Sequence, residues 1–141
     1  LALVDCRWML VDTDTERIRR APGWETEGFQ NEELPEELPQ LVHKSKDLQP
    51  AGEWVAHYSL CDLNGHINNA LYLDIACDAI PLEVWRTREL KFFSIKYHRE
   101  VPMGEKMAVF YAPVEQGWYV VGRREEHAAF ECYLEFKAPE A

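Results

Sequence analysis

Residues 61–81, CDLNGHINNALYLDIACDAIP, are the stretch from which we predict the fold of this chain. The first half is rich in Asp, Asn and Gly, which favour turns. The second half predicts a helix that begins where Asn68 or Asn69 can cap free N–H groups and ends before Pro81, which has no N–H to continue it. Only two aspartates interrupt the apolar residues of this helix, so we expect it to be buried on most sides.

Three polar residues of this stretch, Asp62, Asn64 and His66, stand at alternate positions just before the helix. Asp and His are proton-transfer groups, and the positive end of a helix dipole favours an oxyanion. The junction is therefore a candidate for acid–base chemistry. The same residues also fit a turn that caps a helix and does nothing else.

The spacing of residues 62–72, DLNGHINNALY, resembles the signature of the acyl-acyl-carrier-protein thioesterases, a double hot-dog family. It is similar in outline to the wider hot-dog thioesterases that act on acyl-CoA. Residues 97–100, YHRE, are similar to the family's strand that ends in an aromatic, basic, Arg and Glu run. Residues 8–12 and 15–17 resemble the strand that closes the family's first hot-dog repeat.

The resemblance implies an α+β hot-dog fold, in which an antiparallel sheet wraps around one long buried helix. It implies a fatty acyl-[acyl-carrier-protein] hydrolase that releases free fatty acid in fatty acid biosynthesis. In this reading Asp62 orients Asn64 or His66, Asn64 and His66 hold the substrate and the attacking group, and Glu100 activates water. An acyl-CoA thioesterase, or a non-catalytic hot-dog module that binds an acyl chain or dimerises, is the alternative.

No metal or organic cofactor is implied, because the phosphopantetheine arm arrives with the acyl carrier protein. The family's substrate tunnel draws partly on the first repeat, so these residues do not predict the length of the acyl chain. Some accounts of the family place a cysteine nucleophile directly after the matching Glu. This chain has Val101 there, which offers no nucleophile.

Three parts of the chain differ in character. We interpret residues 1–20 as the end strand of a preceding hot-dog repeat, residues 21–50 as an acidic linker that contains prolines, and residues 51–141 as the hot-dog thioesterase domain. The chain begins at Leu1 without a Met, which we interpret as the start of a processed or truncated chain, and the character of residues 1–20 leaves open whether a first repeat is missing. A lone hot-dog sheet leaves an edge open, so we expect pairing with a second hot-dog unit, either another repeat or a second copy.

Alternation of apolar and polar residues predicts the strands of the sheet. A first strand over residues 1–12 is followed by a short extended return at 16–20. Residues 82–87 are predicted to form an irregular crossing after the helix. The main strands are predicted at 52–60, 89–100, 106–114, 118–123 and 130–137.

The chain has 141 residues and a formal net charge of −10, which argues against nucleic acid as a partner because phosphate binding depends on basic surface. No apolar run approaches the ~18 residues of a membrane span. The resemblance implies an acidic carrier protein as partner, so docking would need a local basic patch. Candidate basic clusters lie at 17–20, 86–99 and 123–124, and each also fits ordinary solvated surface.

The four cysteines lack the spacing of a metal site, and reduced thiols predict a cytoplasmic protein. Cys61 could in principle act as a nucleophile with His66. Strand alternation, however, should point Cys61 away from Asp62, which favours a small buried apolar role for this thiol. The cysteines are Cys6, Cys61, Cys77 and Cys132.

Overall fold

The computed structural model describes residues 3–12, 14–15, 17–20, 37–39 and 43–138. Its contacts divide the chain into two compact units, residues 1–39 and 40–141. Most of the predicted linker at 21–50 lies outside the described residues, and the predicted division of the chain into three parts stays a prediction.

The first unit contains a small antiparallel pair, β1 (Leu10–Val11) and β2 (Ile18–Arg19). Asp12 closes the turn between them, because its carboxylate accepts a hydrogen bond from the Thr15 N–H at 2.9 Å. The predicted short return is confirmed at β2. The predicted strand over 1–12 is confirmed only at Leu10–Val11.

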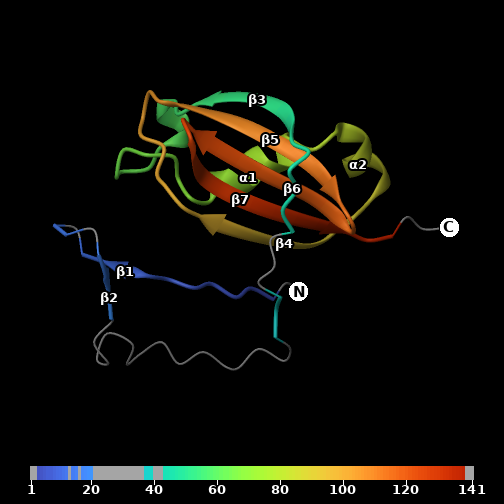
Figure 1. The fold of residues 1–141 in the computed structure, drawn as a ribbon, viewed down its shortest axis with the longest axis horizontal. Helices are drawn as coiled ribbons and strands as arrows, with labels where there is room; N and C mark the ends of the chain where they lie inside the picture. Colours follow the sequence, from blue (N-terminus) through green and yellow to red (C-terminus); the bar gives the residue numbers. More distant parts are fainter. Residues whose placement is uncertain (1–2, 13, 16, 21–36, 40–42, 139–141) are drawn as a thin grey trace. The chain divides into compact units, whose positions relative to one another are not determined.

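The second unit is a five-stranded antiparallel sheet in the order β3-β5-β6-β7-β4. Figure 1 shows this sheet lying across α1, with α2 at one end of it. None of the described helices is long and apolar enough to cross a membrane. The elements are β3 (Gln49–Val55), the 3₁₀ turn η2 (Tyr58–Leu60), α1 (Leu71–Asp78), α2 (Leu82–Thr87), β4 (Leu90–Tyr97), β5 (Lys106–Val114), β6 (Gly117–Arg124) and β7 (His127–Phe136).

The central helix is shorter than predicted, with eight residues from Leu71 to Asp78. The Ile80 N–H bonds to the Cys77 carbonyl at 3.2 Å, which tightens the chain before Pro81 and ends the helix. The helix has no side-chain cap at Ala70, its first flanking residue. The predicted burial is confirmed, since only its two aspartates, Asp74 and Asp78, are exposed between residues 71 and 80.

Two further segments differ clearly from the prediction, while β4, β6 and β7 begin and end within three residues of their predicted bounds. The predicted strand over 52–60 ends at Val55, because the Ala56 N–H bonds to the Glu105 carbonyl and the His57 N–H then turns back to the Val55 carbonyl. The predicted irregular crossing at 82–87 is the helix α2. Glu83 in its first turn and Arg86 in its last suit the helix dipole.

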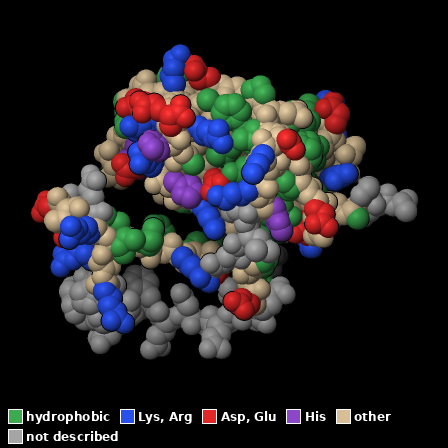
Figure 2. Space-filling model, viewed as in Figure 1, with side chains coloured by type: hydrophobic (Ala, Val, Ile, Leu, Met, Phe, Trp, Pro, Cys, Tyr) green, Lys and Arg blue, Asp and Glu red, His purple; other side chains and the backbone are tan. Residues whose placement is uncertain are grey.

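The sheet face turned away from α1 carries mixed charges, as Figure 2 shows. Glu131 of β7 lies on this face but is only 5% exposed. Its carboxylate accepts hydrogen bonds from Tyr119 and from Lys44, at 2.9 Å for the lysine, and lies 2.8 Å from Nε2 of His98. This network attaches the segment before β3 to the middle of the sheet.

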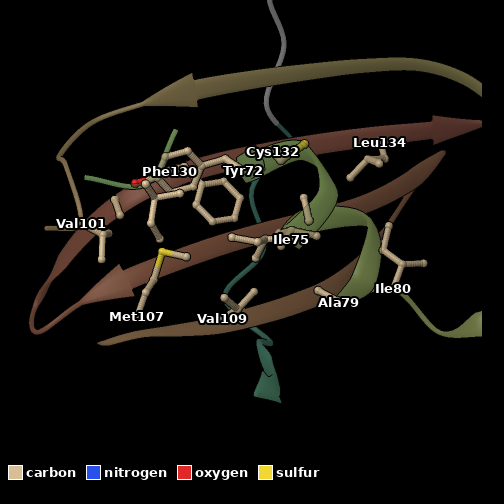
Figure 3. Close-up of a cluster of buried hydrophobic side chains, with 14 of the residues drawn as sticks. Tyr72, Ile75, Ala79, Ile80, Val101, Met107, Val109, Phe130, Cys132 and Leu134 are labelled. Atoms are coloured by element: carbon tan, nitrogen blue, oxygen red, sulfur yellow. The ribbon is translucent and has the colours of Figure 1, made fainter. Parts of the chain in front are cut away.

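The core lies between α1 and the opposite face of the sheet (Figure 3). Tyr72, Ile75 and Ala76 of α1 are buried there. The predicted apolar alternation in the last strand is confirmed, since its four apolar residues, Phe130, Cys132, Leu134 and Phe136, belong to this core. The outward residues Glu131 and Tyr133 are buried as well, so β7 is covered on both faces at its centre.

Candidate active site

The turn before α1 is joined by backbone hydrogen bonds to the segment after β4. The Ile67 N–H bonds to the Val101 carbonyl at 3.0 Å, and the Met103 N–H bonds to the Gly65 carbonyl at 2.9 Å. Gly65 has φ of 79°, a left-handed conformation that glycine adopts without strain. The pairing brings residues 62–66 beside Glu100, although they are far apart in the sequence.

Asp62 shapes this turn through both its backbone and its side chain. Its N–H bonds to the His66 carbonyl at 3.0 Å, and its carboxylate accepts from the Asn64 N–H at 2.9 Å. The side chain keeps 27% of its surface exposed. Asp62 therefore builds the turn and still presents a charged oxygen next to His66.

His66 lies between two carboxylates and is only 15% exposed. Its Nε2 is 3.4 Å from Oε1 of Glu100, and its Nδ1 is 3.9 Å from Oδ1 of Asp62. The Ile67 carbonyl oxygen lies 3.1 Å from the same Nδ1. Both ring nitrogens thus face oxygen atoms, and the ring can donate from both only when it carries two protons.

Glu100 combines a fixed backbone with an open side chain. Nη1 of Arg124 donates to the Glu100 carbonyl at 2.9 Å, and Nε of Arg124 lies 2.9 Å from the Glu105 carboxylate. The next residue, Val101, is completely buried in the core. The Glu100 side chain is 73% exposed, so water can reach its carboxylate.

The structure brings together three of the four predicted site residues. Asp62, His66 and Glu100 form one cluster, whereas the exposed Asn64 side chain makes no hydrogen bond within the described part of the chain. We predicted that free N–H groups at the start of the helix stabilise an oxyanion, but Asn68 already accepts hydrogen bonds from two of these groups. Its carbonyl accepts from the Leu71 N–H, and its side-chain oxygen accepts from the Ala70 N–H.

Two side chains near the site make contacts that the sequence did not predict. Arg124, which belongs to the basic cluster at 123–124, donates to the Glu100 carbonyl from the end of β6. Tyr97 donates from its hydroxyl to the Asn69 carbonyl at 3.0 Å, which ties β4 to the start of α1. No local spacing signals either contact, because each joins segments that meet only in the folded sheet.

The thiol of Cys61 does not contact His66. It lies 3.7 Å from the Ala56 carbonyl, a weak contact for sulfur, and Cys61 forms a backbone bridge with Ile67. Among the described residues, no three His, Cys, Asp or Glu side chains are placed to hold a metal ion. The members of the cluster, Asp62, His66 and Glu100, are acid–base side chains.

Comparison with protein families gives a match over most of this unit. The model of the acyl-ACP thioesterase C-terminal domain matches residues 44–138. Oleoyl-acyl carrier protein thioesterase 2, chloroplastic, from Arabidopsis thaliana is 30% identical over 67% of this chain and 29% of that protein. This chain thus spans less than a third of the length of that relative.

Solved structures share the fold at low sequence identity. An acyl-ACP thioesterase from Bacteroides thetaiotaomicron superposes with a TM-score of 0.76 at 22% identity, over 90% of this chain and 53% of that chain. The 12:0-ACP thioesterase from Umbellularia californica superposes with a TM-score of 0.70 at 18% identity, over 92% of this chain and 52% of that chain. The predicted α+β hot-dog fold is confirmed, with a short central helix in place of a long one.

Proposed function

Because this chain belongs to the acyl-ACP thioesterase C-terminal domain family, we propose that it hydrolyses fatty acyl thioesters of acyl carrier protein and releases free fatty acid. The observation that carries the proposal is the position of His66 between Asp62 and Glu100. A turn that only capped a helix would not need a partly buried imidazole against the carboxylate of a distant segment.

In the proposed reaction, Glu100 takes a proton from water while the water oxygen attacks the thioester carbonyl carbon. The amide of Asn64 donates to the carbonyl oxygen, which becomes negatively charged in the tetrahedral intermediate. Collapse of the intermediate restores the C=O bond and breaks the C–S bond. His66 passes the proton from Glu100 to the leaving sulfur, so the products are a fatty acid and the free thiol of the carrier arm.

A cysteine nucleophile is not part of this proposal. Val101 stands directly after Glu100, is fully buried and has no reactive group. The Cys61 thiol lies near a backbone carbonyl and not near the imidazole that would have to activate it. Water activated by a carboxylate is the route that these side chains support.

An acidic carrier protein would dock most favourably on basic side chains that lack an ion-pair partner. Lys96 and Arg99, just before Glu100, are exposed and form no ion pair among the described residues. Figure 2 shows basic side chains near the end of β4 that leads to Glu100. We assign the docking surface to Lys96 and Arg99.

A second hot-dog unit would pair along β4, which is an edge strand of the sheet. Phe93 and Tyr97 lie on its helix-facing side and are 41% and 43% exposed. A strand at the edge of the described sheet with exposed aromatic rings is a suitable surface for another sheet. Such a unit would lie next to the His66–Glu100 pair.

Hydrolysis of acyl-ACP and acyl-CoA by the same preparation tests the proposed function. We expect free thiol to be released from acyl-ACP at a higher kcat/KM than from acyl-CoA. A preference for acyl-CoA would assign the chain to the acyl-CoA thioesterases. Binding of acyl chains without thiol release would assign it to the non-catalytic modules.

A further inference from the structure

The Tyr72 side chain is a buried polar group that the proposed reaction does not use. Tyr72 belongs to the first turn of α1 and is only 2% exposed. Its ring packs against Phe130, at 5.1 Å between centroids, and against Tyr97, at 5.8 Å. Figure 3 shows its oxygen toward the end of the core where Val101 lies.

The Tyr72 hydroxyl has no hydrogen-bond partner of good geometry among the described residues. Burial raises the pKa of Tyr72 to about 12, the adjoining Val101 backbone opposes this rise, and the charge of Glu100 adds to it. The hydroxyl therefore keeps its proton at neutral pH. Buried hydroxyls in native proteins are nearly always paired, so this unused donor calls for an explanation.

The position of the Tyr72 hydroxyl provides an explanation for this unused donor. It lies toward Val101 in the core, and Val101 directly follows the residue that carries the proposed general base (Figure 3). Other contacts already hold this segment, since Arg124 binds the Glu100 carbonyl and the Ile67 N–H binds the Val101 carbonyl. Among the residues that the structure describes, the Glu100 carboxylate is held only by the 3.4 Å contact with His66.

We propose that Tyr72 is a positioning residue for Glu100. In the reactive arrangement its O–H donates to the Glu100 carboxylate, directly or through one bridging water, and keeps this carboxylate beside Nε2 of His66. The inference deepens the proposed function and rests on it for the role of Glu100. A hydroxyl paired only with a trapped water would have no effect on the Glu100 carboxylate.

The first test does not require turnover. The titration of the Glu100 carboxyl carbon is followed by NMR in the whole chain and in Tyr72→Phe, with Tyr111→Phe as the matched control. Tyr111 packs against Trp118 and lies away from Glu100 in the sheet. A donor to a carboxylate stabilises its charged form, so its loss moves the titration midpoint of Glu100 to higher pH. We expect this shift in Tyr72→Phe and not in Tyr111→Phe.

The second test uses thermal unfolding and kinetics. Tyr72→Phe removes a buried hydroxyl together with its hydrogen bond to an exposed carboxylate, and these effects oppose each other, so its Tm should stay within about 3 °C of the wild type. Its kcat should fall about tenfold, as for the loss of one useful hydrogen bond, while KM changes less than about twofold. An unchanged Glu100 midpoint in Tyr72→Phe would overturn the inference whatever the activity. A wild-type chain without thioesterase activity would instead count against the proposed function, and the titration would still decide the role of Tyr72.

Discussion

Nε2 of His66 lies 3.4 Å from Oε1 of Glu100, and this pair joins the turn before α1 to the segment after β4. The two residues meet because the Ile67 N–H bonds to the Val101 carbonyl at 3.0 Å directly beneath them. The imidazole is largely buried while the carboxylate is open to solvent. One end of the pair can therefore meet water and substrate while the other end is held by the fold.

Replacing Asp62 by Asn should remove the negative charge of this side chain and keep the hydrogen-bond acceptor that the turn uses. An Asn oxygen can still accept from the Asn64 N–H, so Tm should stay within about 3 °C of the wild type. The negative charge 3.9 Å from Nδ1 of His66 is lost, and we expect kcat to fall about 10²-fold. Steady-state kinetics and thermal unfolding of Asp62→Asn give both values.

Two comparisons control this prediction. Asp62→Ala removes the acceptor as well, so it should lose stability in addition to activity. Asp78→Asn changes an exposed carboxylate at the end of α1 and should leave kcat unchanged. Equal activity in Asp62→Asn and Asp78→Asn would mean that Asp62 serves only the turn.

Docking of the carrier should depend on Lys96 and Arg99. We expect the charge reversals Lys96→Glu and Arg99→Glu to raise KM for acyl-ACP about tenfold, and to change KM for acyl-CoA less than about twofold. Added salt should narrow the difference between variant and wild type, because it screens the lost attraction. Equal changes in KM for acyl-ACP and acyl-CoA would show that Lys96 and Arg99 do not dock the carrier protein.

The reversals Arg86→Glu and Arg88→Glu serve as the control. These arginines belong to the same predicted basic cluster at 86–99, so they test whether the whole cluster or only its end near Glu100 docks the carrier. Arg86 lies 3.7 Å from the Glu83 carboxylate, so part of its charge is neutralised. Both arginines precede β4, whose eight residues extend about 25 Å toward Glu100. We therefore expect their reversal to affect KM for acyl-ACP less than reversal of Lys96 or Arg99.

The buried Glu131 carboxylate should make stability depend on pH. Burial raises its pKa, but hydrogen bonds from Lys44, Tyr119 and His98 outweigh this and lower it from 4.5 to about 2. A carboxyl with a depressed native pKa stabilises the fold above its unfolded-state pKa. This stabilisation should be complete above about pH 5 and should decline as the pH falls toward 2.

Urea unfolding of Glu131→Gln measures this contribution. At pH 7 we expect the free energy of unfolding to fall by about 1–3 kcal/mol, and the difference from the wild type to shrink at pH 3. Glu135→Gln is the matched control on the same strand, because Glu135 makes a single ion pair with the exposed Lys91. A difference from the wild type that is the same at pH 7 and pH 3 would contradict the assigned pKa direction.

Gly122 of β6 has no room for a side chain. A Cβ there would press into the Phe130 ring and would lie 2.6 Å from Sδ of Met107. We expect Gly122→Ala to lower the free energy of unfolding by about 1–3 kcal/mol through overpacking. Combining it with Phe130→Leu should cost less than the sum of the two single changes, and strict additivity would show that the ring does not oppose the new methyl group.

Some elements could be predicted from the sequence because the information is local. β5 has the predicted bounds, since turn residues flank an alternating run of apolar side chains. α2 could not be predicted, because a six-residue helix depends on packing more than on propensity. Trp85 provides that packing: its Nε1 donates to the Cys77 carbonyl, and its ring meets Phe136 at 5.1 Å.

The candidate site also has one part that could be predicted from local sequence and another part that could not. Asp62 and His66 share one turn, so their proximity could be predicted from spacing. The approach of Glu100 could be expected only through the family resemblance, because it depends on the long-range pairing of residues 65–67 with 101–103. The hydrogen bond from Arg124 to the Glu100 carbonyl could not be predicted, because no pattern in the sequence indicates it.

The most direct test of the account is the kcat of Glu100→Gln with acyl-ACP, measured beside Glu126→Gln as an exposed control in the turn between β6 and β7. Loss of a general base lowers kcat by about 10²–10⁴-fold. We predict a fall of this size in Glu100→Gln, with an unchanged Tm because the side chain is 73% exposed, and wild-type activity in Glu126→Gln. Full activity in Glu100→Gln, or an acyl group trapped on Cys61, would contradict the account.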